Sequence, residues 1–303
     1  MNSALVAALT VVTWIATVVA VTLFGRTLAS MVRTYRGGQP TRRSDNPGQR
    51  TATLLRETLL ASRLKQQPVG TIVATAHWIV LVSFFVLFLT LITAYGQLLN
   101  PDFVIPLFGH FPPFGWLVEA LAWLMVLSIV FSIALRVSNR PDTKGRDSRF
   151  FGSTMWQAYY VEITILLVGV CVIALRAMEY ALGSSKGESW ATVVHFPFTA
   201  WIGSWFAQTP DATFETGIAV VAFVKIAVSM AWLITVAAQP TMGVAWHRFL
   251  AFFNVWFQRN ADGRPALGAL QPIAVKGEAI DFENIDELDD DASLGVGAIG
   301  DFT

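Results

Sequence analysis

The stretch TIVATAHWIVLVSFFVLFLTLITA, residues 71–94, decides the fold class of this chain. It contains no Asp, Glu, Lys or Arg. It is also long enough to cross a bilayer, because a helix rising ~1.5 Å per residue spans the ~30 Å hydrocarbon core with about 20 residues. Four more apolar blocks of similar length lie at 5–24, 114–135, 155–182 and 217–238. The sequence therefore predicts an all-α integral membrane protein with a five-helix transmembrane bundle.

The composition also indicates a membrane protein. Of the 303 residues, 54% are hydrophobic and 14% are charged, whereas soluble domains carry about 25% charged residues. The first block is longer than the ~7–15-residue apolar region of a secretory signal, so we expect it to be retained. The fifth block ends before Pro240, and an alternative is that its helix extends to 257. We expect residues 1–258 to form the membrane domain and 259–303 to form an acidic cytoplasmic linker or tail.

Basic residues indicate the orientation of the bundle, because short loops rich in Lys and Arg stay in the cytoplasm. Nine basic residues lie between the first and second blocks, five between the third and fourth, and four after the fifth. The two loops on the opposite side contain a single basic residue, Lys186. We therefore expect the amino terminus to be outside and the carboxyl terminus to be cytoplasmic.

Two connecting segments have patterns of their own. The connector after the first block is expected to break at Gly37, Gly38 and Pro40, and then to form an amphipathic helix over 51–65 on the membrane surface. Its basic residues would contact anionic lipid headgroups. The apolar face of this helix consists of Leu54, Leu55, Leu59, Leu60 and Leu64. The segment 183–216 is rich in Trp and Phe, which is typical of a short interfacial or re-entrant element.

Ionisable residues within the blocks are candidate functional residues, because each costs roughly 2.5 to 3.5 kcal/mol on insertion scales. Arg176 and Glu179 are three residues apart, so we expect a structural ion pair on one helix. Glu162 and Lys225 leave two alternatives, namely a buried pair between the fourth and fifth spans, or a path for a quinone headgroup and its protons. The full set is His77, Glu119, Glu162, Arg176, Glu179 and Lys225.

His77 and His247 lie at similar depth near the cytoplasmic ends of the second and fifth spans. Two neutral imidazoles on facing helices are the axial ligands that a b-type haem requires. The alternative is that each is a single interfacial histidine. His110 and His195 fall in outer loops and are expected at the interface, with a quinone entrance or a second metal site as alternatives.

The chain has one cysteine, Cys171. It therefore has no internal disulfide and cannot alone hold an iron–sulfur cluster, which needs about four thiolates. No nucleic-acid-binding pattern or phosphate-binding loop is present in the sequence.

Four stretches resemble the membrane part of actinobacterial iron–sulfur oxidoreductases, the group with heterodisulfide-reductase-like cysteine-rich domains that includes dehydrogenases of electron-transfer flavoprotein. They are SRFFGS at 148–153, TMGVAWHRF at 241–249, LGALQPI at 267–273 and GVGAIGDFT at 295–303. The resemblance covers essentially the whole chain. In that family the five-helix domain is similar to the cytochrome b (gamma) subunit of respiratory nitrate reductase.

The resemblance implies a cofactor and partners. The nitrate reductase pattern places two haem ligands on each of the second and fifth helices, and the inner pair corresponds to His77 and His247. The outer positions correspond to Leu87 and Ser229, which are not haem ligands, so the resemblance implies one haem b and leaves room for a quinone near Lys225 and Ser229. In relatives the chain continues into 4Fe-4S cluster motifs, which here would belong to a separate chain or to a missing part of this one.

The leading hypothesis is a membrane anchor of a respiratory iron–sulfur oxidoreductase, a multi-pass protein of a bacterial plasma membrane. It would transfer electrons between a cytoplasmic Fe-S module and menaquinone through a haem on His77 and His247. Lys225, Ser229 and Glu162 are the quinone-site candidates, and no catalytic residue is assigned. A non-redox tether for a cytoplasmic partner is the alternative. A transporter is less favoured, because no repeat relates the two halves.

Overall fold

The computed structural model describes residues 3–36, 43–66 and 69–264, together with 274–275, 278–279 and 283. The helices are α1 (Ser3–Arg36), α2 (Pro47–Thr58), α3 (Gly70–Leu99), α4 (Pro112–Ser138), α5 (Pro141–Lys144), α6 (Met155–Ser185), α7 (Ala200–Ser204), α8 (Asp211–Ala238) and α9 (Gly243–Trp256). Short 3-10 helices cover Leu64–Gln66 and Gly145–Asp147. The two-residue strands β1 (Ala274–Val275) and β2 (Glu278–Ala279) pair antiparallel.

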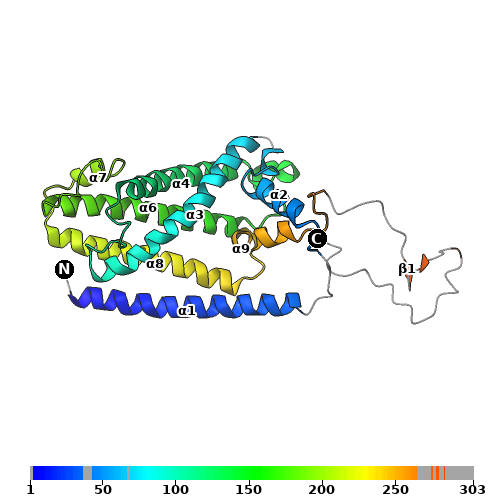
Figure 1. Cartoon of the computed structure of the whole chain (residues 1–303), viewed down its shortest axis with the longest axis horizontal. Coiled ribbons are helices and arrows are strands. Elements are labelled where there is room, and N and C mark those ends of the chain that lie inside the picture. Colours follow the sequence, from blue (N-terminus) through cyan, green and yellow to red (C-terminus); the bar gives the residue numbers. More distant parts are fainter. Residues whose placement is uncertain are drawn as a thin grey trace. The chain divides into compact units, whose positions relative to one another are not determined.

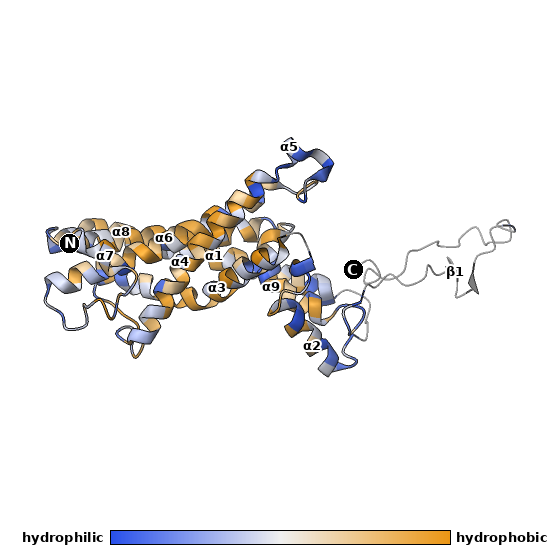
Figure 2. Ribbon diagram, turned by 90° about the horizontal axis from the view of Figure 1, so that it is seen from above, coloured by the Kyte–Doolittle hydropathy of each residue, from blue (hydrophilic) through white to orange (hydrophobic). Residues whose placement is uncertain are grey.

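Five of these helices, α1, α3, α4, α6 and α8, are long and apolar enough to cross a membrane. This confirms the predicted all-helical fold with five spans and indicates a multi-pass membrane protein. Figure 2 shows the apolar colour running along the long helices, whereas α5 is hydrophilic. Each long helix extends beyond its predicted block; α8, for example, begins at Asp211 rather than near 217. The polar residues at helix ends lie outside an apolar block but still continue the helix.

The chain divides into two compact units, one formed by Met1–Ser30 and Arg63–His247 and the other by Met31–Ser62 and Arg248–Thr303. In the first unit, α3 packs against α4 and α8, and α6 packs against the same two helices. Figure 1 shows these four helices alongside one another. Small buried residues such as Ala94, Ala122 and Ala222 allow the helices to approach closely. The result is a four-helix core.

Helix α1 packs on this core through a narrow strip of its surface. Ala20 is fully buried in a cluster with residues of α3, α6 and α8. The Thr17 hydroxyl forms a hydrogen bond of 2.6 Å with the Tyr95 hydroxyl, and the Thr27 hydroxyl donates to the Ala237 carbonyl at 2.9 Å. The opposite face of α1 is exposed and apolar, with side chains that include Val11, Val12, Ile15 and Val18. Such a face suits contact with lipid.

The fifth span does not continue as one helix to 257, so that alternative is wrong. Helix α8 ends at Ala238, and α9 begins at Gly243. Pro240 explains the break, because proline has no N–H to donate and its ring clashes with the carbonyl four residues earlier. The Val236 carbonyl instead accepts a hydrogen bond of 3.1 Å from the indole Nε1 of Trp246. The start of α9 is thereby held against the end of α8.

The second unit contains the end of α1, α2, most of α9 and the segment after α9. The predicted amphipathic helix over 51–65 is placed too late, because α2 begins at Pro47, a residue suited to the first helical position. The helix ends at Thr58. Ala61 has a positive φ of 48°, and a right-handed helix cannot continue through this backbone conformation. Leu55, Leu59 and Leu60 are exposed, as an apolar surface face requires.

Arg50 of α2 organises this second unit. Its side chain is 1% exposed, and it donates to the carbonyls of Trp256 at 3.0 Å and Gln258 at 2.7 Å. It also pairs with Asp45 at 2.6 Å, and this hydrogen bond holds the pKa of the Asp45 carboxyl below its usual value. Gly37, Gly38, Pro40 and most of the predicted acidic tail lie outside the described residues.

In the segment 183–216, α6 continues to Ser185 and α8 begins at Asp211, and the residues between them form turns and the five-residue helix α7. Tryptophan side chains of α4 hold its backbone, because Trp116 donates to the Val194 carbonyl and Trp123 donates to the Phe198 carbonyl. The two ends of the first unit therefore differ. We call the end with residues 100–111 and 186–210 the loop end, and the end where α3 begins and α8 finishes the histidine end.

Candidate functional site

The structure brings His77 of α3 and His247 of α9 together at the histidine end. Their ring centres are 6.1 Å apart, and the ring planes make an angle of 37°. Both side chains are exposed. The predicted proximity of these two imidazoles, from positions 170 residues apart in the sequence, is therefore present in the structure.

Two features next to His247 position its ring. The His247 Nδ1 lies 2.8 Å from the Val244 carbonyl oxygen. Because a carbonyl can only accept, Nδ1 carries the proton, and the lone pair of the neutral ring is then on Nε2. A backbone carbonyl on the second nitrogen is the usual arrangement for a metal-binding histidine.

Trp246, the residue before His247, anchors the start of α9. Its side chain is 2% exposed, and its indole donates to the carbonyls of Val236 and Gln239. The ring also stacks on Phe24 of α1, with centres 5.4 Å apart and planes 7° from parallel. The sequence TMGVAWHRF thus turns the chain after α8, fixes α9 by its tryptophan and presents its histidine towards α3.

The separation of the two ring centres can be compared with the separation that a metal ion held between two imidazoles requires. Two metal–imidazole bonds of about 2 Å each, in line, place the ring centres about 6 Å apart. The observed separation is 6.1 Å. The angle between the two ring planes is compatible with this separation, because each ring can rotate about its metal–nitrogen bond without a change in the length of that bond.

The positions that correspond to an outer pair of haem ligands have other environments. Leu87 is 4% exposed and packs in a core cluster with Val118 and Leu121. The Ser229 hydroxyl donates to the Lys225 carbonyl of its own helix at 2.8 Å. Leu87 contributes to helix packing, and Ser229 satisfies its hydrogen bond locally.

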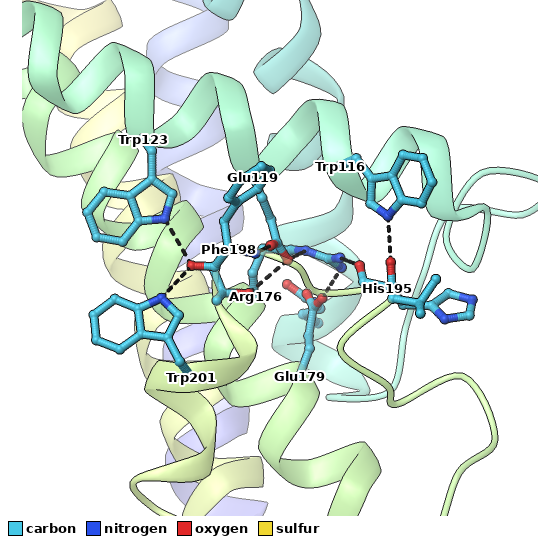
Figure 3. A network of polar contacts seen from close by, with 11 residues as sticks. Trp116, Glu119, Trp123, Arg176, Glu179, His195, Phe198 and Trp201 are labelled. Atoms are coloured by element: carbon cyan, nitrogen blue, oxygen red, sulfur yellow. Dashed lines mark hydrogen bonds and ion pairs between the residues drawn. The ribbon is translucent and has the colours of Figure 1, made fainter.

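The loop end holds a dense cluster of buried charges (Figure 3). Glu119 of α4 is completely buried; its Oε1 accepts from Arg176 at 3.2 Å and from the Thr199 hydroxyl at 2.8 Å. Its Oε2 accepts from the backbone N–H of Phe198 at 2.8 Å. Arg176 also pairs with Glu179 at 2.7 Å, which confirms the predicted ion pair. Glu119 therefore ties α4 and α6 to the loop before α7.

The buried pair between Glu162 and Lys225, one of the two alternatives from the sequence, is wrong. Glu162 of α6 instead accepts two hydrogen bonds from Arg136 of α4, at 2.9 and 2.8 Å. Lys225 of α8 donates to the carbonyl and the hydroxyl of Thr90 on α3, at 2.7 and 2.6 Å. The sequence does not indicate either partner, because Arg136 lies just after the third apolar block and Thr90 carries no charge.

Lys225 lines a cavity on the loop-end side of the core. The volume that the centres of water molecules can occupy is about 40 Å³, which is enough for a few waters because one needs about 10 to 15 Å³. Its polar walls are Thr90, Thr93, Gln97, Arg176, Glu179 and Lys225. The side chain of Gln97 donates to Glu179 at 2.5 Å. Gln97 lies three residues after the apolar block 71–94, so the block pattern gives no signal for this contact.

His110 and His195 line one smaller cavity at the same end, together with Trp190 and Arg176. The His110 ring lies 4.5 Å from the Trp190 ring, centre to centre, and His195 Nδ1 lies 3.1 Å from the Thr192 hydroxyl. Among the residues that the structure describes, no group of three or more His, Cys, Asp or Glu side chains is arranged to hold a metal ion.

Lys186, also at this end, pairs with Asp102 at 2.9 Å, and this hydrogen bond raises the pKa of the Lys186 ammonium.

Comparison with known proteins does not assign this chain to a family. No protein-family model, no curated protein and no solved structure matches it. The functional argument therefore depends on the geometry of the two ends and on the sequence patterns.

Proposed function

We propose that this chain is the membrane anchor of a respiratory iron–sulfur oxidoreductase, in which His77 and His247 are the axial ligands of one b-type haem. The observation that carries the proposal is the 6.1 Å separation of the two imidazole rings. A haem held in this way supplies a one-electron carrier. The chain would transfer electrons between a cytoplasmic Fe-S module and menaquinone, in the plasma membrane of a bacterium.

The residues of this chain have distinct roles in the proposal. His77 and His247 each provide one ring nitrogen, and the Val244 carbonyl fixes the tautomer and the orientation of the His247 ring. Trp246 holds α9 at the end of α8, which sets the distance between the two histidines. These contacts hold the His247 ring and the start of α9 in position before a ligand binds.

The distribution of basic residues supports a cytoplasmic position for the histidine end. The loops at this end carry most of the Lys and Arg residues of the chain, as short cytoplasmic loops do. The amino terminus would then be outside and the carboxyl terminus inside. Because Cys171 is the single cysteine, the 4Fe-4S clusters would be bound by a partner chain or by another part of the protein. A carrier near the cytoplasmic surface would shorten the distance that an electron crosses from such clusters.

Of the three quinone-site candidates, the structure favours Lys225. Its ammonium group lines a cavity and can donate to a carbonyl oxygen. Ser229 donates within its own helix, and Glu162 is held by Arg136. The cavity in its present form admits water but is smaller than a quinone ring, so binding of a headgroup requires the cavity to widen.

Absorption spectroscopy tests the haem proposal. We expect the purified chain, expressed with haem available, to show a Soret band and a b-type pyridine haemochrome spectrum. His77→Ala and His247→Ala should each remove the six-coordinate spectrum. His110→Ala and His195→Ala are matched controls, because these histidines lie at the loop end, and they should retain it. Absence of haem from the unsubstituted protein would contradict the redox function and favour the non-redox tether.

A further inference from the structure

Lys225 has more hydrogen-bonding capacity than its protein neighbours use. The residue is 1% exposed, and both of its hydrogen-bond acceptors belong to Thr90. An ammonium group has three N–H donors, so one remains for a molecule in the cavity that Lys225 lines. Among the described residues, no carboxylate forms an ion pair with Lys225 within 4.0 Å.

The charged groups around Lys225 come from two helices. Cys171 and Glu179 of α6 interact with it electrostatically. Arg176 of the same helix lines the same cavity and links it to Glu119 of α4. Helix α3 contributes the neutral residues Thr90, Thr93 and Gln97. An ordered water molecule needs about two to four polar partners. The donors and acceptors that line the cavity are sufficient to provide them.

A second cavity continues from the first towards the loop end. Both cavities are lined by Gly109, Gly115 and Arg176, and the second also reaches His110 and His195. Gly115 lies where the linings of the two cavities overlap, and Arg176 and the His195 carbonyl pack close against it. A Cβ atom at this position would lie 2.9 Å from Arg176 Nη2 and 3.1 Å from the His195 carbonyl oxygen.

We infer that the two cavities form one water-filled path through which Lys225 exchanges protons with the aqueous phase at the loop end. In each step an N–H or O–H bond of the donor breaks and an O–H or N–H bond of the acceptor forms, and no electron is transferred. Lys225 alternates between ammonium and amine, while Glu179, Arg176 and the two histidines line the route. The path itself is independent of the haem. Its use for the protons of a quinol rests on the proposed function.

Cysteine accessibility tests the path in the full chain reconstituted in liposomes. In a Cys171→Ser background, Thr93→Cys places a thiol in the wall of the first cavity, and Ile92→Cys places one on the exposed apolar face of the same helix. Silver ion is a thiol-reactive cation of about the size of a water molecule, and it reaches thiolates through water and not through lipid. We expect Thr93→Cys to react at least about tenfold faster than Ile92→Cys, and only with reagent on the loop-end side.

Narrowing the junction should slow this reaction. Gly115→Ala adds a Cβ between the two cavities, whereas Gly217→Ala at the same end adds one that meets only Met178 at 3.1 Å. We expect the first variant to react several times more slowly and the second at the unchanged rate. Equal rates for Thr93→Cys and Ile92→Cys, or reaction from the histidine-end side, would overturn the path.

The proton exchange is tested by varying the pH on each side of the membrane separately. The reaction rate of Thr93→Cys depends on the charge of Lys225, because a nearby cation favours the thiolate. The same rate is measured in a variant that carries Lys225→Gln in addition to Thr93→Cys. The difference between the two rates should change with the pH on the loop-end side and not with the pH on the other side. A difference that follows neither side contradicts proton exchange. The Soret band, measured on the same samples, separates this result from failure of the proposed function.

Discussion

The two ends of the helical core hold their polar residues in different ways. At the loop end, Glu119, Arg176 and Glu179 are buried and contact one another, the loop backbone and Gln97. At the histidine end, His77 and His247 are exposed, with rings 6.1 Å apart. The loop-end cluster satisfies its charges within the protein, as a structural network does. The histidine pair instead lies at the surface of the core, where a ligand can reach it.

The largest expected effect is at the centre of the loop-end cluster. Glu119→Ala should lower the free energy of unfolding by about 3 to 5 kcal/mol, because it leaves the Arg176 charge buried without one of its carboxylates. It also removes the acceptor of the Phe198 N–H. Unfolding by a denaturing detergent measures the change. Glu188→Ala is the control, because Glu188 is an exposed acidic residue of the same end. Equal stability of the two variants would show that the cluster is not a structural network.

A smaller effect is expected where α9 joins α8. Trp246→Phe retains an aromatic ring against Phe24 but removes the hydrogen bonds to Val236 and Gln239. Both carbonyls keep a backbone donor, from Gln239 and Met242, so the loss is that of the indole hydrogen bonds, about 0.5 to 1.5 kcal/mol each. Because Trp246 also positions His247, we expect a weaker or shifted haem spectrum in the same variant. Trp201→Phe, at the loop end, should leave the spectrum unchanged.

The pair between Lys186 and Asp102 should contribute less, about 0.2 to 1 kcal/mol, because both side chains are partly exposed. The pKa of Lys186 is raised above its ordinary value of 10.5 by the hydrogen bond to Asp102. A raised ammonium pKa stabilises the fold fully below pH 10.5, and this contribution is lost as the pH rises through the higher folded-state value. Lys186→Gln should therefore lower thermal stability near neutral pH, and the difference from the unsubstituted protein should disappear in strongly alkaline solution.

The sequence was sufficient for the five spans, because block length and apolar composition depend only on local residues. It was also sufficient for the Arg176–Glu179 pair, because residues three apart share one helix face. It was not sufficient for the partners of Lys225 and Glu162. Those partners depend on which turn of α8 faces α3 and which turn of α6 faces α4, and helix rotation and depth are set by packing. Buried Arg50 was missed for a related reason, because arginine is buried only where other segments supply acceptors.

Substitution of His77 or His247 is expected to have the smallest effect on stability, although it is expected to have the largest effect on function. His77→Ala and His247→Ala should change the unfolding free energy of the haem-free protein by no more than about 0.5 kcal/mol, because both side chains are exposed. With haem present, the unsubstituted protein should be stabilised and the variants should not, because a ligand stabilises only the state that binds it. Thermal unfolding with and without haem measures both quantities. Strong destabilisation of the haem-free variants would give these histidines the same structural role as Glu119, and the contrast between the two ends would then disappear.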